Sequence, residues 1–326
     1  MSVRLPPAVA RLAIRQLGRR VLDPELPWAV QRQRLDQAMR ASPLPRGTAA
    51  RRTIIGGVPA EVVTAPRAGP ERTVLHFHGG GYCVGSALMA RGWAARLSAR
   101  AGCQVILPEY RLAPGHRYPA ALQDAHQVLN AIMGPVGPAS IVVSGDSAGG
   151  GLALALLLAR RDADGAGPDE RPAGCMLLSP WLDLGQDRRG RPDLVRRDVL
   201  LSPGWLDACA RAYTEPANWP DPAVSPLRAA HRGLPPLLIQ AGDAELLAPD
   251  AGLLAASASE AGVDVSYTRW PGMWHNFALQ PGVIAAADSA LAQAAWFVTT
   301  VTGRLTPPVV SRPSQPAAGR RSGYSK

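Results

Sequence analysis

Lysine is almost absent from this chain, although the chain is strongly basic. The 326 residues contain one lysine, Lys326, so the formal net charge of +10 comes almost entirely from arginine. Eleven arginines against three acids lie in residues 1–52, and four arginines with no acid lie in residues 303–326. Basic ends suit nucleic acid or an anionic membrane. No recognition-helix pattern, aromatic–basic alternation or zinc motif accompanies them, so we expect no nucleic-acid partner.

Cysteine is also scarce. The four cysteines are widely spaced and form no Cys-x-x-Cys pair: Cys83, Cys103, Cys175 and Cys209. This spacing predicts neither a zinc site nor a disulfide framework. It favours buried free thiols in a cytoplasmic protein.

Long apolar runs are missing as well. The longest uncharged one, residues 149–159, is too short to cross a bilayer, so we expect no stable membrane association. Residues 1–20 contain scattered arginines and neither a clean apolar core nor a small-residue cleavage site, so they do not resemble a signal peptide. Val9, Leu12, Ala13 and Leu17 instead have the spacing of an amphipathic helix.

What the chain does contain is a regular alternation of strand and helix signals after residue 47. This order is typical of an α/β fold, a parallel sheet with helices on both faces. A hairpin is expected over 52–55 and 60–64, and strands over 73–77, 103–107, 141–144, 174–178, 236–241 and 264–270. Helices are expected over 88–101, 118–133, 152–160, 203–213, 249–261 and 281–301.

Two segments stand apart from this alternation. Residues 1–45 predict helices interrupted by Pro24 and Pro27, with the second helix over 28–39. Residues 183–222 are rich in Asp, Arg, Pro and Trp and predict a single helix. We expect 46–182 and 223–302 to form one α/β domain, and 183–222 to be an insertion over the strand ends, where ligands bind. Residues 1–45 would add a helical cap segment, and 303–326 a disordered basic tail.

The most informative stretch is residues 141–151. A β-branched run there ends in Gly-Asp-Ser-Ala-Gly, residues 145–149, and good helix formers follow. Strand, tight turn and helix in this order form the context of a nucleophile elbow, which exposes a serine hydroxyl at the edge of a sheet. Glycine suits positions 145 and 149, because a side chain would collide with the neighbouring strand or helix. The pattern indicates Ser147 as a nucleophile.

A serine nucleophile needs a base and an orienting carboxylate. His275 lies between the last expected strand and the last expected helix, and none of the other five histidines does. Two acids, Asp243 and Glu245, follow the strand expected at 236–241. The chain order of serine, acid and histidine is that of α/β-hydrolases. Spacing alone does not choose between the two acids.

Three glycines follow the strand expected at 73–77, in the sequence His-Gly-Gly-Gly at 78–81. Glycines let the backbone approach a substrate closely and aim its N–H groups inward. We expect the N–H groups of Gly79, Gly80 and Ala148 to form an oxyanion hole, which stabilises negative charge during acyl transfer. A phosphate-binding loop is disfavoured, because no Gly-Lys-Ser/Thr and no helix-opening Gly-x-Gly-x-x-Gly is present.

Taken together, these motifs resemble the hormone-sensitive-lipase family of the α/β-hydrolase superfamily, the bacterial family IV carboxylesterases. The resemblance covers roughly residues 50–302. It rests on HGGG, YRLAP at 110–114, YPA at 118–120, GDSAG and SPW at 179–181, followed by an acid and a C-terminal histidine. The family resemblance implies an α/β-hydrolase fold with a mostly parallel central sheet and a helical cap.

The same resemblance selects among the candidate residues. Residues 245–250 match the family's D/E-x-L-x-x-D/E pattern, which implies Glu245 as the triad acid and leaves Asp243 in reserve. His78, Gly81 and Asp146 are implied as supports of the loop beside the elbow. Glu109 and Arg111 are implied as structural supports of the HGGG loop.

The implied reaction is hydrolysis of a carboxylic ester through an acyl-enzyme, with no metal and no cofactor. We expect a cytoplasmic serine carboxylesterase acting on small-molecule esters of short or medium chain length, including lactones or acetylated metabolites. An amidase or peptidase on the same fold, or a non-catalytic small-molecule-binding protein, stays open as an alternative. A homodimer also stays open, and the physiological ester is not set by the sequence.

A last expectation concerns the cap. The N-terminal segment has an apolar face that must be buried, formed by Leu12, Leu17, Val21, Leu22 and Trp28. The insertion carries further apolar residues, Leu194, Val199, Leu200 and Trp205. We expect the two segments to pack together over Ser147 and to wall the acyl pocket.

Overall fold

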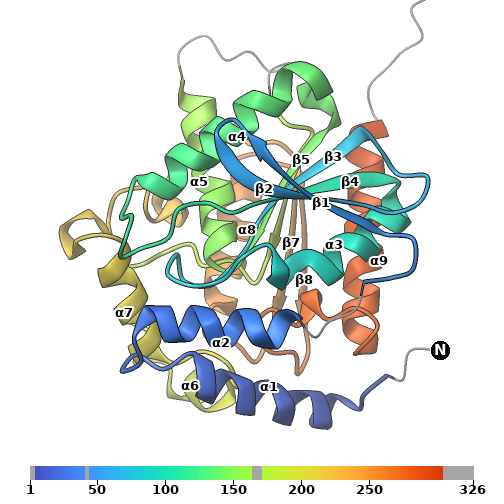
Figure 1. Ribbon diagram of the computed structural model, residues 1–326. Helices are drawn as coiled ribbons and strands as arrows, with labels where there is room; N and C mark the ends of the chain where they lie inside the picture. The colour runs from blue at the N-terminus through green and yellow to red at the C-terminus, as the bar shows by residue number, and fades with distance from the viewer. Residues whose placement is uncertain (1–3, 41–43, 164–170, 304–326) are drawn as a thin grey trace, which may run out of the picture.

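A computed structural model describes residues 4–40, 44–163 and 171–303 of the chain (Figure 1). Its centre is an eight-stranded sheet in the order β1-β2-β4-β3-β5-β6-β7-β8. The strands are β1 Ala49–Ile55, β2 Val58–Thr64, β3 Gly69–Phe77, β4 Cys103–Pro108, β5 Ile141–Asp146, β6 Gly174–Leu178, β7 Leu237–Gly242 and β8 Val265–Trp270. Strand β2 is antiparallel to β1 and to β4, and the other neighbours are parallel. The predicted fold class is confirmed.

Helices cover both faces of this sheet, with α4, α5 and α8 on one face and α3 and α9 on the other (Figure 1). They are α3 Leu88–Ala101, α4 Ala120–Val136, α5 Ala148–Asp162, α8 Ala248–Glu260 and α9 Ala285–Gly303. Successive residues of a strand point to opposite faces. Val142 accordingly packs in the core beneath α3 and α9, whereas Val143 packs in the core beneath α4 and α5. Both faces are apolar, as a sheet buried on both sides requires.

Four more helices lie together at one end of the sheet (Figure 1). Helices α1 Pro7–Val21 and α2 Trp28–Arg40 come from the N-terminal segment, and α6 Pro192–Arg197 and α7 Pro203–Tyr213 come from residues 183–222. The indole N–H of Trp205 in α7 donates to the Gln31 side chain of α2 at 2.9 Å. Gly18 of α1 lies directly against Leu200, between α6 and α7.

The strand predictions agree with the structure to within a few residues, including the hairpin of β1 and β2. One helix was missed, α6, because its six residues are too few to show a helical period among so many polar neighbours. The other expected helices are present, although α5 begins at Ala148 and not at 152, and α9 begins at Ala285 and not at 281, since a turn occupies residues 281–283. The tail predicted to be disordered lies, apart from Gly303, outside the described residues.

No helix among the described residues is both long and apolar enough to span a bilayer.

Candidate active site

The strand, tight turn and helix predicted around Ser147 are present, with Ser147 between β5 and α5. Ser147 has φ +53° and ψ −122°, a strained conformation for a residue with a side chain. A Cβ atom at Gly145 would overlap the backbone of Gly149, and one at Gly149 would overlap the carbonyl of Phe77. The tight packing of β5, α5 and β3 therefore requires glycine on both sides of the serine.

His275 and Glu245 meet in the loops that follow β8 and β7. The imidazole Nδ1–H donates to Glu245 Oε2 at 2.9 Å, and both side chains are buried. The other carboxylate oxygen, Oε1, accepts the N–H of Gly242 at 3.0 Å, which fixes the carboxylate plane. Burial opposes protonation of His275, but the hydrogen bond and the charge of Glu245 outweigh it, so the pKa of His275 is raised above its ordinary value.

Asp243, the reserve acid, lies elsewhere. Its Oδ1 atom accepts Arg197 Nη2 at 2.8 Å and the N–H of Gly272 at 2.7 Å. No hydrogen bond joins it to His275 in the described part of the chain. The structure contradicts Asp243 as the partner of the imidazole, because its carboxylate is already engaged in connecting α6 to the loop that carries His275.

Ser147 and His275 line the same cavity, which has a volume of about 190 Å³. Among the described residues, no hydrogen bond joins the Ser147 hydroxyl to the imidazole of His275. Such bonds are often long in unliganded enzymes and shorten when substrate binds. The hydroxyl and the imidazole share one cavity, and the carboxylate of Glu245 bonds the imidazole, so the groups that nucleophilic catalysis needs are brought together.

The predicted oxyanion hole needs one correction, at Gly79. The N–H of Gly79 donates to Asp146 Oδ1 at 3.0 Å and is therefore not free for a ligand. Gly80 and Gly81 follow with φ values of +114° and +61°, and Gly80 lines the cavity beside Ser147. Within the described residues, no acceptor binds the N–H of Gly80, Gly81 or Ala148. Gly80 lines the cavity, Gly81 follows it, and Ala148 follows Ser147, so these three N–H groups are candidate oxyanion donors.

Asp146 and His78 both hold the glycine loop, as the family resemblance implied. Besides Gly79, Asp146 accepts Asn276 Nδ2 at 2.6 Å, so one carboxylate connects the loop to the residue after His275. The His78 ring donates from Nδ1 to the carbonyl of Gly79 at 2.7 Å. Burial lowers the pKa of His78.

Tyr110 is the residue of the YRLAP motif that supports the glycine loop. Its hydroxyl donates to the carbonyl of His78 at 2.7 Å, and its ring stacks on the His78 ring with centroids 4.4 Å apart. Arg111 instead forms an ion pair with Asp124 of α4 at 2.8 Å. Glu109 accepts the N–H of Ala87, at the start of α3. These contacts agree with a structural role for Glu109 and Arg111, and their support of the HGGG loop stays a prediction.

Asp198, at the C-terminal end of α6, was not singled out from the sequence. Its Oδ1 accepts the N–H groups of Leu200 and Leu201, each at 2.8 Å, and its Oδ2 accepts the N–H of Leu246 at 2.7 Å. Leu246 directly follows Glu245, and Leu200 and Leu201 line the cavity. Burial raises the pKa of Asp198, and its charge also acts on His275. One carboxylate thus connects the cavity wall to the loop of Glu245.

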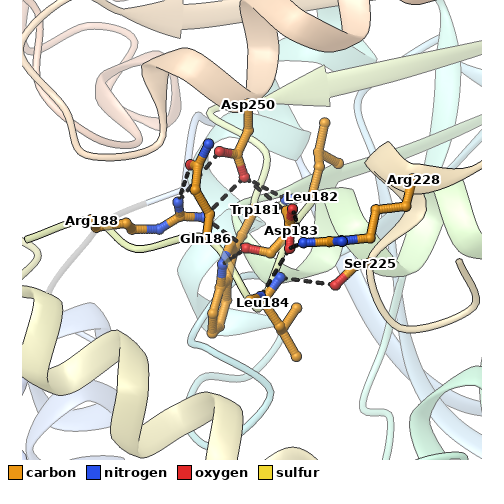
Figure 2. A network of polar contacts seen from close by, with 10 residues as sticks. Trp181, Leu182, Asp183, Leu184, Gln186, Arg188, Ser225, Arg228 and Asp250 are labelled. Carbon is orange, nitrogen blue, oxygen red and sulfur yellow. Dashed lines mark hydrogen bonds and ion pairs between the residues drawn. The ribbon is translucent and has the colours of Figure 1, made fainter. Parts of the chain in front are cut away.

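A second buried network fixes the beginning of the insertion (Figure 2). Asp250, the last residue of the ExLxxD pattern, accepts the N–H groups of Leu182 and Asp183 at 2.9 and 3.2 Å. The buried Arg188 forms an ion pair with Asp250 at 3.0 Å and also donates to the carbonyl of Asp183. Burial raises the pKa of Asp250, although Arg188 opposes the shift. The network anchors the insertion to the start of α8.

The cavity is walled mainly by apolar side chains from both cap segments. The N-terminal segment contributes Ile14, Leu17, Gly18, Val21, Leu22, Leu35 and Met39, and residues 183–222 contribute Leu200, Leu201 and Trp205. The α/β domain adds Val84, Met89, Asn276, Leu279 and Gln280 around Gly80, Ser147 and His275. The site can therefore hold a mostly apolar ligand against the serine.

No three His, Cys, Asp or Glu side chains gather so as to hold a metal ion in the part of the chain that the structure describes. Independence from a cofactor stays a prediction. All four cysteines are free and buried, as expected.

Comparisons with known proteins agree with this geometry. A family model for the alpha/beta hydrolase fold matches residues 74–279. An esterase of Acinetobacter venetianus is 35% identical over 269 residues, which cover 82% of this chain and 87% of that protein. An acetyl-hydrolase of Streptomyces hygroscopicus is 34% identical over 259 residues, which cover 76% of this chain and 85% of that protein.

Comparison with solved structures also finds esterases. The crystal structure of an esterase from the bacterial hormone-sensitive lipase family is 30% identical to this chain, with a TM-score of 0.85. The similarity covers 92% of this chain and all of that one. This chain therefore belongs to the alpha/beta hydrolase fold family, among the bacterial hormone-sensitive-lipase esterases.

Proposed function

We propose that the chain is a serine carboxylesterase in which Ser147, His275 and Glu245 form the catalytic triad. The observation that carries the proposal is the buried Glu245–His275 hydrogen bond beside a serine on a strained elbow. The carboxylate fixes the imidazole tautomer, with the proton on Nδ1, and leaves Nε2 as the base. The raised pKa of His275 agrees with stabilisation of the imidazolium by Glu245.

The reaction proceeds in two acyl transfers. Ser147 Oγ attacks the ester carbonyl while His275 Nε2 takes the hydroxyl proton. The tetrahedral intermediate collapses, and the leaving alcohol takes that proton from His275. Water then attacks the acyl-enzyme with the same proton transfers and releases the acid. Each step uses only these residues and water.

The negative charge of the intermediate needs donors that are free before substrate binds. Gly80, Gly81 and Ala148 supply such N–H groups, and Ala148 is the first residue of α5, where the helix dipole also favours an anion. Gly79 supports the loop through Asp146 and does not contribute a donor. Removing one such donor typically costs about a hundred- to a thousandfold in turnover.

The cavity favours short- to medium-chain esters with an apolar acyl or alcohol part. Its apolar walls come from both cap segments, in support of the division into cap and catalytic domain expected from the sequence. Acetylated alcohols are one candidate substrate class, since a relative is named an acetyl-hydrolase. Lactones remain within the proposal. The cytoplasmic location, the absence of a nucleic-acid partner and the oligomeric state stay predictions.

A panel of p-nitrophenyl esters of increasing chain length, with several lactones and matching anilides, tests this proposal. We expect hydrolysis of the short and medium esters, a decline for long chains and slower turnover of the anilides. Faster turnover of anilides would favour the amidase alternative. Binding of esters without turnover would favour the non-catalytic alternative.

A further inference from the structure

Exposed apolar side chains gather around helix α1. Of the large apolar residues that are exposed in the described part of the chain, most lie on this helix or its neighbours: Leu5, Val9, Leu12, Val195 and Val283. The N–H of Leu5 donates to the carbonyl of Val283 at 2.8 Å, which places that segment beside the start of α1. Val195 of α6 lines a surface groove together with Arg11 and Arg15 of α1. These contacts place Val283 beside Leu5 and Val195 beside Arg11 and Arg15, whereas Ile54, Leu253 and Trp296 are exposed on other elements.

Helix α1 has two different apolar faces. Its inner face, with Ile14, Leu17 and Val21, lines the active-site cavity. Val9 and Leu12, three residues apart, lie on the opposite side and are 50% and 59% exposed. The core and the cavity do not explain why this outer face is apolar.

Arginines flank the outer face. Helix α1 contains four arginines and no acid. At 100° per residue, Gln16 lies between Val9 and Leu12, and Arg15 and Arg20 lie on opposite sides of these two apolar residues. Gln16, Arg15 and Arg20 are all exposed. Exposed apolar residues bordered by arginines are typical of helices that lie in the surface of a membrane.

We propose that this outer face of α1 docks on the surface of an anionic phospholipid bilayer. A second copy of the chain is a poor occupant, because a twofold contact would bring the same arginines together. The C-terminal residues 304–326 are also a poor occupant, since they carry only basic charges. Such docking departs from the expectation of no stable membrane association, which rested on the lack of a bilayer-spanning run; a helix that lies in the interface requires no such run.

Docking would place the cavity close to the lipid. The helix that contacts the headgroups is also a wall of the cavity, so an apolar ester dissolved in the membrane would have a short path to Ser147. Membrane binding itself does not depend on hydrolysis, and the two properties are measured separately.

The test is cosedimentation of the full chain with vesicles of phosphatidylcholine alone or mixed with phosphatidylglycerol, at low and high salt. One variant combines Val9→Ser with Leu12→Ser, and a second combines Arg15→Glu with Arg20→Glu. The matched controls lie on β1: Ile54→Ser, at a side chain that is 71% exposed, and Arg51→Glu with Arg52→Glu. Turnover of p-nitrophenyl butyrate in solution checks that each variant is folded.

We expect the wild type to bind the mixed vesicles in a salt-dependent manner and to bind phosphatidylcholine weakly. Each α1 variant should bind on the order of tenfold more weakly or worse, and the β1 controls should bind like the wild type. No preference for anionic vesicles would overturn the inference. Unchanged binding by the α1 variants would overturn it too, because attachment would then lie elsewhere, for example in residues 304–326. A third result would also overturn the inference: a wild-type dimer that binds no vesicles and that the Val9→Ser, Leu12→Ser variant dissociates.

Discussion

Replacing Asp198 by asparagine tests whether the cavity wall and the triad are coupled. The carboxylate accepts the N–H groups of Leu200 and Leu201 at one oxygen and that of Leu246 at the other. Asparagine keeps one carbonyl oxygen but has an NH₂ group in place of the second. If the carbonyl oxygen of the asparagine keeps the bonds to the N–H groups of Leu200 and Leu201, its NH₂ group faces the N–H of Leu246. Two donors then meet, and the hydrogen bond beside Glu245 is lost.

The expected magnitude follows from these contacts. A buried N–H left without an acceptor costs about 1–3 kcal/mol. Burial raises the pKa of Asp198, so removing its charge offsets part of that cost. We therefore expect Asp198→Asn to lower the unfolding free energy by no more than about 2 kcal/mol. Turnover should fall on the order of tenfold, which corresponds to about 1.4 kcal/mol at the transition state.

The pH profile gives the sharper readout. Burial opposes protonation of His275, whereas the charges of Glu245, Asp198 and Asp146 raise its pKa. The free enzyme needs a neutral His275, so kcat/KM should rise with pH through that pKa. Removing the charge of Asp198 lowers the pKa of His275. The acidic limb of kcat/KM should therefore move to lower pH.

The assay is the pH dependence of p-nitrophenyl butyrate hydrolysis, normalised by active-site titration. Asp207→Asn is the matched control, because Asp207 lies in the same insertion but is partly exposed and pairs with Arg189. The control should keep the wild-type profile. An Asp198→Asn enzyme with wild-type turnover and an unmoved acidic limb, but a lower melting temperature, would refute the coupling and leave Asp198 a purely structural role.

Two further predictions concern the triad acid and the cap. Glu245→Gln should lower turnover on the order of a thousandfold or more, because the imidazole loses its orienting carboxylate. Asp243→Asn should cost far less, since its carboxylate holds Arg197 and Gly272 and not His275. The reverse ranking, measured by kcat at saturating ester, would show that Asp243 is the acid. Deleting residues 1–45 should alter chain-length preference and raise KM more than it lowers the melting temperature of the core; equal relative activities across an ester panel would contradict that.

The regular part of the fold was predictable because the sheet is buried on both faces. Runs such as residues 141–143 must be apolar and β-branched to fill both cores, so their period and length were visible in the sequence. The elbow was equally visible, because the close approach of Phe77 and the start of α5 forces glycine at 145 and 149.

The remaining site residues depend on contacts between distant parts of the chain. Three consecutive glycines offer several N–H groups, and only the position of Asp146 shows that the one on Gly79 is already bonded. Asp198 could not be distinguished among the many acids and arginines of its segment, because its role arises from a bond to Leu246. The sequence contains only a weak indication that Asn276 belongs to the site: asparagine tolerates the left-handed backbone conformation, which Asn276 adopts directly after His275.

The most direct test of the account is the turnover of Ser147→Ala on p-nitrophenyl butyrate, with circular dichroism and thermal melting to show that the variant is folded. The account predicts a folded protein whose turnover is lower by several orders of magnitude, because the acyl-enzyme cannot form. Retention of more than about a tenth of wild-type turnover, far above what the loss of a nucleophile allows, would contradict Ser147 as the nucleophile.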